Sequence, residues 1–293
     1  MESFDIKRYK TLLLETFKEF IGICNQNNLQ YYCAGGTALG AVRHQGFIPW
    51  DDDIDVLMPR ADYEKILSLN LENINKNFGV ISARNTSIGA TFAKFYNKNT
   101  TLWELKEIPF VYGIYIDIFP LDESSDNIDK FLIKYRKLRN IQRLYQLSQM
   151  SFIFEDIVGY YKKKDMKYFY KGLLSLFFPH FCANYLRTQL LKVEKMFMHQ
   201  IGEHYVCPYG EYFAKEYFDK KWFDEGIELP FEGLMVKVPM QYDAYLKHVF
   251  GDYMKLPPKE KQVSHHYHYF LDMDKGMTLE EIKKVLANKK KES

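Results

Sequence analysis

Four aspartates crowd into five positions near the start of the chain, at Asp51, Asp52, Asp53 and Asp55. If the stretch "DIDVLM" is extended, Asp53 and Asp55 point to the same face, roughly 6–7 Å apart along the backbone. Two carboxylates that close repel each other unless a cation lies between them. Hard oxygen ligands of this kind suit Mg²⁺ or Mn²⁺. An acidic turn or a calcium loop is the alternative, but the calcium-hand glycine and later glutamate are absent.

A further aspartate, Asp117, lies in the middle of the apolar stretch "YIDIFPLD" (115–122). A carboxylate in a buried strand is costly unless it is paired or coordinated. We therefore expect Asp117 to complete the metal site or to act as a general base. The alternative is an edge residue that faces water.

Two glycines and a threonine, Gly35, Gly36 and Thr37, stand between a short strand candidate (31–34) and a short helix that closes at Gly46. Glycines there let backbone N–H groups approach a phosphate, and a helix N-terminus favours negative charge. A Gly-Gly pair alone is weak evidence. Together with the aspartates it predicts phosphoryl or nucleotidyl transfer, with the metal on the carboxylates and the phosphate on the turn.

The elements that must position these residues follow from the hydrophobic periodicity. Apolar residues at three- and four-residue steps predict a helix over 5–27. Strands are expected at 54–58, 78–83, 91–97 and 112–121, and Pro59 is well placed to begin a helix. The order predicts an α+β fold, with a catalytic core over 1–124.

A basic helical insert is expected over 125–204. Residues 131–171 hold ten Lys or Arg residues against three acids, an excess of seven positive charges. This is either a solvated helix face or a surface that meets anionic lipid or an anionic polymer. The aromatic segment 205–293, with a hairpin near 217–239 and a terminal helix from Thr278, is expected to complete the substrate cleft.

Composition limits the class of protein. The 293 residues carry a net charge of +2, which argues against a dedicated nucleic-acid binder. The four cysteines fit no zinc spacing and are expected to be reduced thiols. No signal peptide and no apolar run of about 18 residues is evident, so a cytoplasmic protein is expected.

The stretch "AGGTALGAVRHQGFIPWDDDIDVLMPRADYE" (34–64) resembles the signature of the LicD family of bacterial phosphocholine transferases. "GIYIDIFPLD" (113–122) and "FGDYMKLPP…H" (250–265) match in the same order. The family is similar to the fukutin-related glycan transferases and has a nucleotidyltransferase-like mixed β-sheet core. The resemblance implies transfer of phosphocholine from a cytidine diphosphate (CDP)-linked donor to a sugar hydroxyl. That hydroxyl would belong to a bacterial surface glycan or its lipid-linked precursor.

The resemblance also implies roles for particular residues. Asp53 and Asp55 match the family's metal-binding pair and Asp117 its third carboxylate, while Asp51 would support the metal indirectly. Gly35, Gly36 and Thr37 would hold the donor phosphate. Arg43 and His44 are candidates for the diphosphate, and Lys94 is a further phosphate candidate. These last three have structural alternatives, namely a helix C-terminal pair and an edge-strand lysine.

Several questions stay open at this point. A true nucleotidyltransferase that releases pyrophosphate would use the same carboxylates, and a non-catalytic glycan- or membrane-binding protein could retain the fold. Choline, ethanolamine, ribitol or glycerol phosphate could be the donor group. Trp50 and Trp222 could stack on a base or on a quaternary ammonium. His265, His266 and His268 could contact substrate, bind a metal or simply pack.

Overall fold

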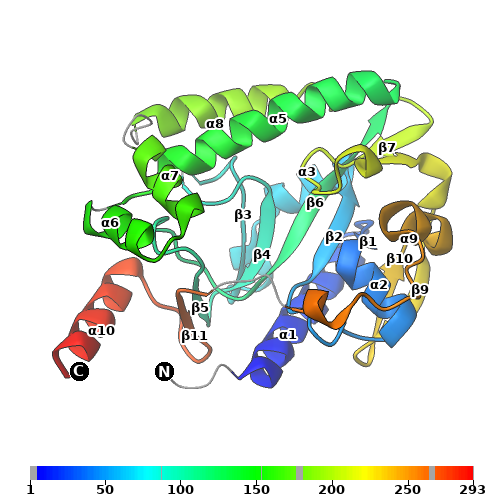
Figure 1. Cartoon of the computed structure of the whole chain (residues 1–293). Coiled ribbons are helices and arrows are strands. Elements are labelled where there is room, and N and C mark those ends of the chain that lie inside the picture. Colours follow the sequence, from blue (N-terminus) through cyan, green and yellow to red (C-terminus); the bar gives the residue numbers. More distant parts are fainter. Residues whose placement is uncertain (1–4, 87, 153, 176–180, 264–267, 293) are drawn as a thin grey trace.

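The computed structural model describes the chain except residues 1–4, 87, 153, 176–180, 264–267 and 293. Its centre is a mixed sheet in the order β1-β2-β6-β4-β3, with helices packed around it (Figure 1). The strands are β1 (Tyr32–Cys33), β2 (Asp55–Pro59), β3 (Phe78–Ile81), β4 (Ala93–Asn97) and β6 (Tyr115–Ser124). The predicted α+β class is confirmed.

The two strands that carry aspartates are neighbours in this sheet. β2 and β6 run parallel, with Asp55 opposite Asp117, whereas β4 runs antiparallel to β6, with Lys94 opposite Asp117. A parallel pair needs a long crossover, and the chain between them forms α3 (Arg60–Ser68), α4 (Leu71–Ile74), β3, β4 and β5 (Thr101–Trp103). Pro59 immediately precedes α3, as predicted, because its fixed φ suits a helix start.

The first helix covers the sheet with one apolar face. α1 (Ile6–Gln26) begins where the Asp5 carboxylate accepts a hydrogen bond from the Arg8 N–H at 3.1 Å. Its buried residues recur at helical spacing, and Phe17 and Phe20 are fully removed from water. Phe20 packs edge-on against Phe95 of β4, with ring centroids 5.8 Å apart. The helix predicted over 5–27 is therefore confirmed.

The segment after the core sheet is helical, as expected. It forms α5 (Ile128–Gln149), α6 (Phe154–Lys162), α7 (Met166–Ser175) and α8 (Phe181–Glu194). α5 and α8 lie side by side across one end of the sheet (Figure 1). Tyr135, Leu138 and Leu190 are among the side chains of their shared buried cluster. α6 and α7 form a smaller hairpin beside them.

Strands of the C-terminal segment pair with strands of the N-terminal half of the chain. β7 (His204–Val206) pairs with the end of β6 and with β8 (Tyr217–Asp219). The predicted hairpin is β9 (Ile227–Phe231) with β10 (Leu234–Val238), and α9 (Tyr242–Phe250) follows. The pairing of β11 (Phe270–Asp272) with β5 was not predicted. The terminal helix α10 (Leu279–Glu292) begins directly after Thr278, as expected.

Two expectations from composition have structural counterparts. The four cysteines are free thiols, and Cys24, Cys33 and Cys207 are buried. Among the described residues, no helix combines the length and the apolar character that a membrane crossing requires.

Candidate active site

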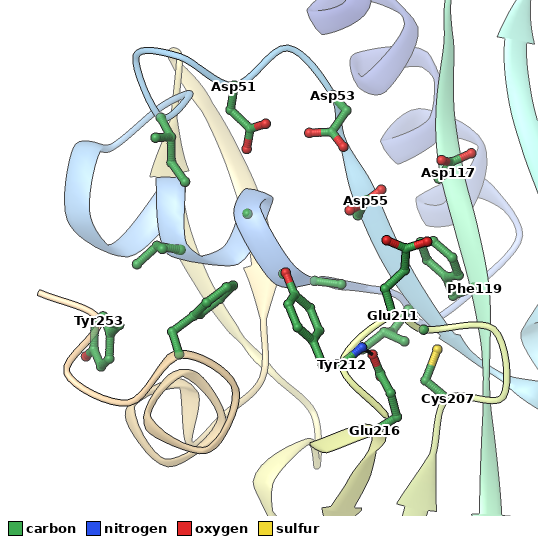
Figure 2. Close-up of a pocket in the computed structure, with 18 of the residues that line it drawn as sticks. Asp51, Asp53, Asp55, Asp117, Phe119, Cys207, Glu211, Tyr212, Glu216 and Tyr253 are labelled. Carbon is green, nitrogen blue, oxygen red and sulfur yellow. Dashed lines mark hydrogen bonds between the residues drawn. The ribbon is translucent and has the colours of Figure 1, made fainter. Parts of the chain in front are cut away.

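Four aspartates singled out from the sequence line one cavity of about 950 Å³. Asp51 and Asp53 lie on the loop that leads into β2, Asp55 is the first residue of β2, and Asp117 lies on the neighbouring β6 (Figure 2). Only Asp55 belongs to the strand, yet Asp53 still faces the same cavity. Asp52, by contrast, is buried away from it.

Backbone hydrogen bonds fix the two strand aspartates. The Asp55 N–H donates to Thr37 Oγ1 at 2.9 Å, and the Asp55 carbonyl accepts from the Ala34 N–H at 3.0 Å. The Asp117 N–H donates to the Ile54 carbonyl at 2.9 Å. The Thr37 side chain is therefore buried under the site. It positions Asp55 and does not line the cavity, which differs from its expected phosphate contact.

Lys94 also has a different partner from the expected one. Its Nζ donates to Asp117 Oδ1 at 2.7 Å and lies 3.6 Å from the Tyr115 ring centroid. Lys94 is not among the residues that line the cavity. Cross-strand register brings the pair together, because Lys94 and Asp117 are directly opposite on adjacent strands. The Lys94 ammonium therefore fixes one of the four aspartates that line the cavity. We call these four, Asp51, Asp53, Asp55 and Asp117, the carboxylate row.

The site carries more negative charge than Lys94 offsets. The pKa of Asp55 lies well above its ordinary value, chiefly because burial penalises the charged form. The charges of Asp53, Asp117 and Asp51 add to this rise. Carboxylate oxygens under such repulsion are suitable donors for Mg²⁺ or Mn²⁺. As they stand, no three His, Cys, Asp or Glu side chains within the described residues converge closely enough to hold one ion. The fit of these aspartates to a divalent cation therefore rests on their oxygen donors and their negative charge.

The Gly-Gly pair begins a helix instead of preceding one. α2 (Gly35–His44) starts at Gly35, whose φ of +46° lies in the left-handed region that favours glycine. The Gly35 N–H donates to Tyr245 Oη at 3.0 Å. A Cβ at Gly36 would come within 2.5 Å of Asp51 Oδ2. Both glycines line the cavity, and at Gly36 the close neighbour is a carboxylate of the site.

The end of α2 bonds to the C-terminal segment. Arg43 lines the cavity, but its Nη1 donates to the Tyr253 carbonyl at 2.6 Å and its Nε to His44 Nε2 at 2.9 Å. His44 does not line the cavity. The pKa of His44 is lowered, first by burial and then by Arg43, which favours the neutral ring as the hydrogen-bond acceptor. Arg43 thus holds the chain around Tyr253 against the site.

Of the other aromatic and histidine candidates, some line the cavity and others pack elsewhere. Trp50 lines the cavity. Trp222 packs against His248, with ring centroids 5.3 Å apart, and is not part of the lining. His268 packs against Tyr9 at 5.1 Å, whereas His265 and His266 lie outside the described residues.

Much of the facing wall was not identified from the sequence. Glu211, Tyr212 and Glu216 reach the cavity from the loop after β7 (Figure 2). The Tyr135 hydroxyl of α5 holds this loop through the Gly210 carbonyl at 2.7 Å. One face of α5 also lines the cavity, through Arg139, Gln142, Arg143 and Gln146. Positions i, i+3, i+4 and i+7 form a single helix face, which was the signal present in the sequence.

We expect Glu216→Gln to change how stability depends on pH. Burial raises the pKa of Glu216 to about 7, and Glu211 adds to the rise, whereas the Tyr212 N–H and Arg139 oppose it. Between the unfolded value of 4.5 and about 7, the folded state binds more protons, so stability falls as pH rises. An amide cannot ionise, so the variant should match wild type near pH 4.5 and exceed it at pH 8 by up to about 3 kcal/mol. Urea denaturation across this range measures the difference, and parallel curves would contradict the assignment.

Comparison with known proteins places this site in a family. Residues 28–157 match the family model described as LicD/FKTN/FKRP, nucleotidyltransferase domain. The lipopolysaccharide cholinephosphotransferase LicD of Haemophilus influenzae is 25% identical over 272 residues, which span 91% of this chain and 97% of LicD. The ribitol 5-phosphate transferase FKRP of Homo sapiens is 41% identical over 44 residues, or 15% of this chain and 9% of FKRP.

The matched domain contains α2, β2 and β6, and therefore every carboxylate of the row from Asp51 to Asp117. It also contains α5. Residues 28–157 thus match the nucleotidyltransferase domain of the LicD/FKTN/FKRP family, and the chain is similar to LicD over most of its length.

Proposed function

We propose that this protein transfers a phospho-substituent, phosphocholine in the first instance, from a CDP-linked donor to a sugar hydroxyl of a surface glycan or its lipid-linked precursor. The observation that carries the proposal is the row of Asp53, Asp55 and Asp117 in one large cavity. Similarity over 97% of a cholinephosphotransferase supports the choice of choline. The shorter match to a ribitol 5-phosphate transferase supports the same class of reaction.

The proposed role of each residue follows from its position in the cavity. Asp53 and Asp55 would hold a divalent cation, with Asp51 beside them. That cation, when bound, would neutralise charge on the transferring phosphoryl group. Lys94 fixes one oxygen of Asp117. We infer that this carboxylate serves an acceptor hydroxyl or helps to hold the same ion. The cavity walls bring the two substrates together, and this positioning supplies much of the catalysis in phosphoryl transfer.

A thermal-shift panel tests the donor and the cation together. CDP-choline, CDP-ethanolamine, CDP-ribitol and CDP-glycerol are each added with and without Mg²⁺. A ligand that binds only the folded state raises its stability by about 2.7 kcal/mol at a hundredfold excess over Kd. We expect the largest rise in melting temperature with CDP-choline plus Mg²⁺. No rise with any of the four conjugates would contradict the proposal.

A labelled donor separates the remaining alternatives. With label in the cytidine and in the choline, phosphocholine transfer releases labelled cytidine monophosphate and leaves choline on the acceptor. A nucleotidyltransferase would instead leave the nucleotide on its product. A non-catalytic protein would release neither, although it could still bind glycan.

A further inference from the structure

One polar face of α5 forms part of the wall of the cavity that holds the carboxylates. Arg139, Gln142, Arg143 and Gln146 all line the cavity at successive turns of this helix. The sequence grouped these arginines with the lysines of the basic insert, but the structure separates them. The arginines face the same space as Asp53, Asp55 and Asp117, whereas the lysines of α6 and α7 do not line it.

A short chain of contacts orients Arg139. The Gln142 amide donates to Thr91 Oγ1 at 3.0 Å, which leaves Gln142 Oε1 to accept from Arg139 Nη1 at 3.0 Å. Gln142 and Thr91 are both buried. The Arg139 guanidinium is 3.5 Å from Glu211, whose side chain is 81% exposed. An exposed partner at that distance binds weakly, so an anionic ligand can replace it.

Arg143 lies one turn further along and has no such partner. It makes no hydrogen bond or ion pair with the residues that the structure describes. Two other cations line the cavity: Arg43, which bonds to the Tyr253 carbonyl, and Lys255. A cavity with so many carboxylates repels an anionic substrate unless fixed cations face it. A guanidinium is suited to that role because it binds phosphate oxygens in a bidentate manner.

We propose that Arg139 and Arg143, supported by Gln142 and Gln146, form a phosphate-binding subsite that holds a substrate phosphate in the same cavity as the carboxylate row. This subsite proposal rests on the proposed function only for the identity of the substrate. The phosphate belongs either to the donor diphosphate or to a phosphorylated acceptor, since the same chemistry recognises both. This proposal places an anion site on α5, whereas the sequence led us to expect one at the Gly35-Gly36 turn.

Arg143→Gln tests the subsite by direct binding. Isothermal titration calorimetry in the presence of Mg²⁺ uses inorganic pyrophosphate, CDP-choline and N-acetylglucosamine 1-phosphate as probes. We expect a 10- to 100-fold loss of affinity for at least one probe, as for one charge-assisted contact. Arg143→Lys should lose less affinity, because lysine keeps the positive charge but lacks the bidentate geometry of the guanidinium. Lys137→Gln is the matched control: it removes one exposed charge from α5 outside the cavity and should stay within about twofold of wild type.

Each outcome has a separate meaning. A loss confined to pyrophosphate and CDP-choline assigns the subsite to the donor, and a loss confined to the sugar phosphate assigns it to the acceptor. If Arg143→Gln binds all probes as wild type does, or if wild type binds none, the subsite is wrong. Arg143-dependent binding of CDP-choline without release of cytidine monophosphate would overturn the proposed transfer and leave the subsite standing.

A second, independent observation concerns the hairpin of α6 and α7. Four apolar side chains of α7 at i, i+4, i+7 and i+8 are exposed among the described residues: Met166, Tyr170, Leu173 and Leu174. Phe154 and Tyr161 of α6 are exposed beside them. The inner face of the hairpin packs separately, through Tyr160 stacked on Tyr168 at 5.2 Å. The outer stripe is therefore an amphipathic surface that this hairpin does not cover.

Lysines flank that stripe. Between 161 and 171 the chain holds Lys162, Lys163, Lys164, Lys167 and Lys171 against a single acid, Asp165. Exposed aromatic and aliphatic side chains with flanking lysines match the headgroup region of an anionic bilayer. We infer that the α6–α7 hairpin docks on anionic membrane. This would place the cavity near a lipid-linked acceptor.

Vesicle sedimentation tests this docking. We expect the protein to bind phosphatidylcholine vesicles with 30% phosphatidylglycerol at least tenfold more tightly than pure phosphatidylcholine, and to dissociate in 0.5 M NaCl. Lys163→Gln with Lys164→Gln should weaken binding about 25-fold, since each lysine is worth roughly a factor of five. Lys283→Gln with Lys284→Gln on α10 is the matched control. Equal binding to both vesicle types, or concentration-dependent dimerisation abolished by Leu173→Ser with Leu174→Ser, would overturn the proposal.

Discussion

Asp53→Asn is expected to lower turnover of CDP-choline more than about a hundredfold while leaving the fold intact. Loss of a group that only supports a metal ligand already costs 10- to 100-fold, and Asp53 faces the cavity directly. The substitution also removes the largest charge contribution to the raised pKa of Asp55. Repulsion within the row therefore falls, and the melting temperature should stay the same or rise. Loss of activity without loss of stability is the signature of a functional carboxylate.

The measurement pairs initial rates at saturating Mg²⁺ with thermal denaturation. Asp129→Asn is the control, because Asp129 is an exposed aspartate in the first turn of α5 and does not line the cavity. It should retain the wild-type rate. If Asp53→Asn also keeps the wild-type rate at saturating Mg²⁺, Asp53 has no part in the reaction and the proposed metal pair is wrong.

The sequence predicted most elements because their signals are local. α1 and the strands around Asp55 and Asp117 follow from periodicity alone. Asp53 and Asp55 face one cavity although only Asp55 is in the strand, since burial continues to alternate through Ile54 in the preceding loop. The three-residue strands β5 and β11 were missed, because so short a run has no readable period.

What local patterns could not supply was pairing across the chain. Asp55 and Asp117 are 62 positions apart, and only the parallel register of β2 with β6 makes them neighbours. The antiparallel register of β4 with β6 likewise places Lys94 opposite Asp117. Thr37 is buried, and its hydroxyl accepts from the Asp55 N–H, a contact that joins α2 to β2. In each case the residue was identified from its type, but its partner depends on tertiary structure.

The glycines of α2 show a related limit. Gly35 and Gly36 were expected to form a turn before the helix, yet they are its first two residues, although glycine disfavours helices by about 1 kcal/mol. Packing overrides this preference. A Cβ at Gly40 would lie 2.4 Å from the Gly46 carbonyl oxygen, so the helix and the following loop can only approach this closely with glycine.

Arg60→Met should be the most destabilising of the substitutions considered, at about 3–5 kcal/mol, because it leaves buried carboxylates without their cation. Arg60 donates to Asp122 through Nε at 2.7 Å and Nη2 at 2.6 Å, and to Glu194 of α8 through Nη1 at 2.8 Å. The Asp122 and Glu194 side chains are 1% and 4% exposed. Arg84 reaches Glu194 as well, at 3.0 Å, but one guanidinium cannot replace both.

Urea denaturation measures this loss, and Arg8→Met is the matched control. The Arg8–Asp274 pair is exposed on both sides, so its removal should cost far less stability than removal of Arg60. Adding Asp122→Leu to Arg60→Met should recover part of the loss, because one uncompensated charge is then removed too. A cost for Arg60→Met as small as that for Arg8→Met would contradict a buried network.

The same substitution connects stability to binding. Arg60 of α3 joins the core sheet, through Asp122 of β6, to α8, which packs beside α5. If α5 supplies the phosphate subsite, loosening α8 should weaken CDP-choline binding even under conditions where Arg60→Met remains folded. Arg143→Gln should weaken binding without this loss of stability, since Arg143 is exposed and makes no contact of this kind with the described residues. The two variants thus separate a residue that holds the wall in place from one that binds the ligand.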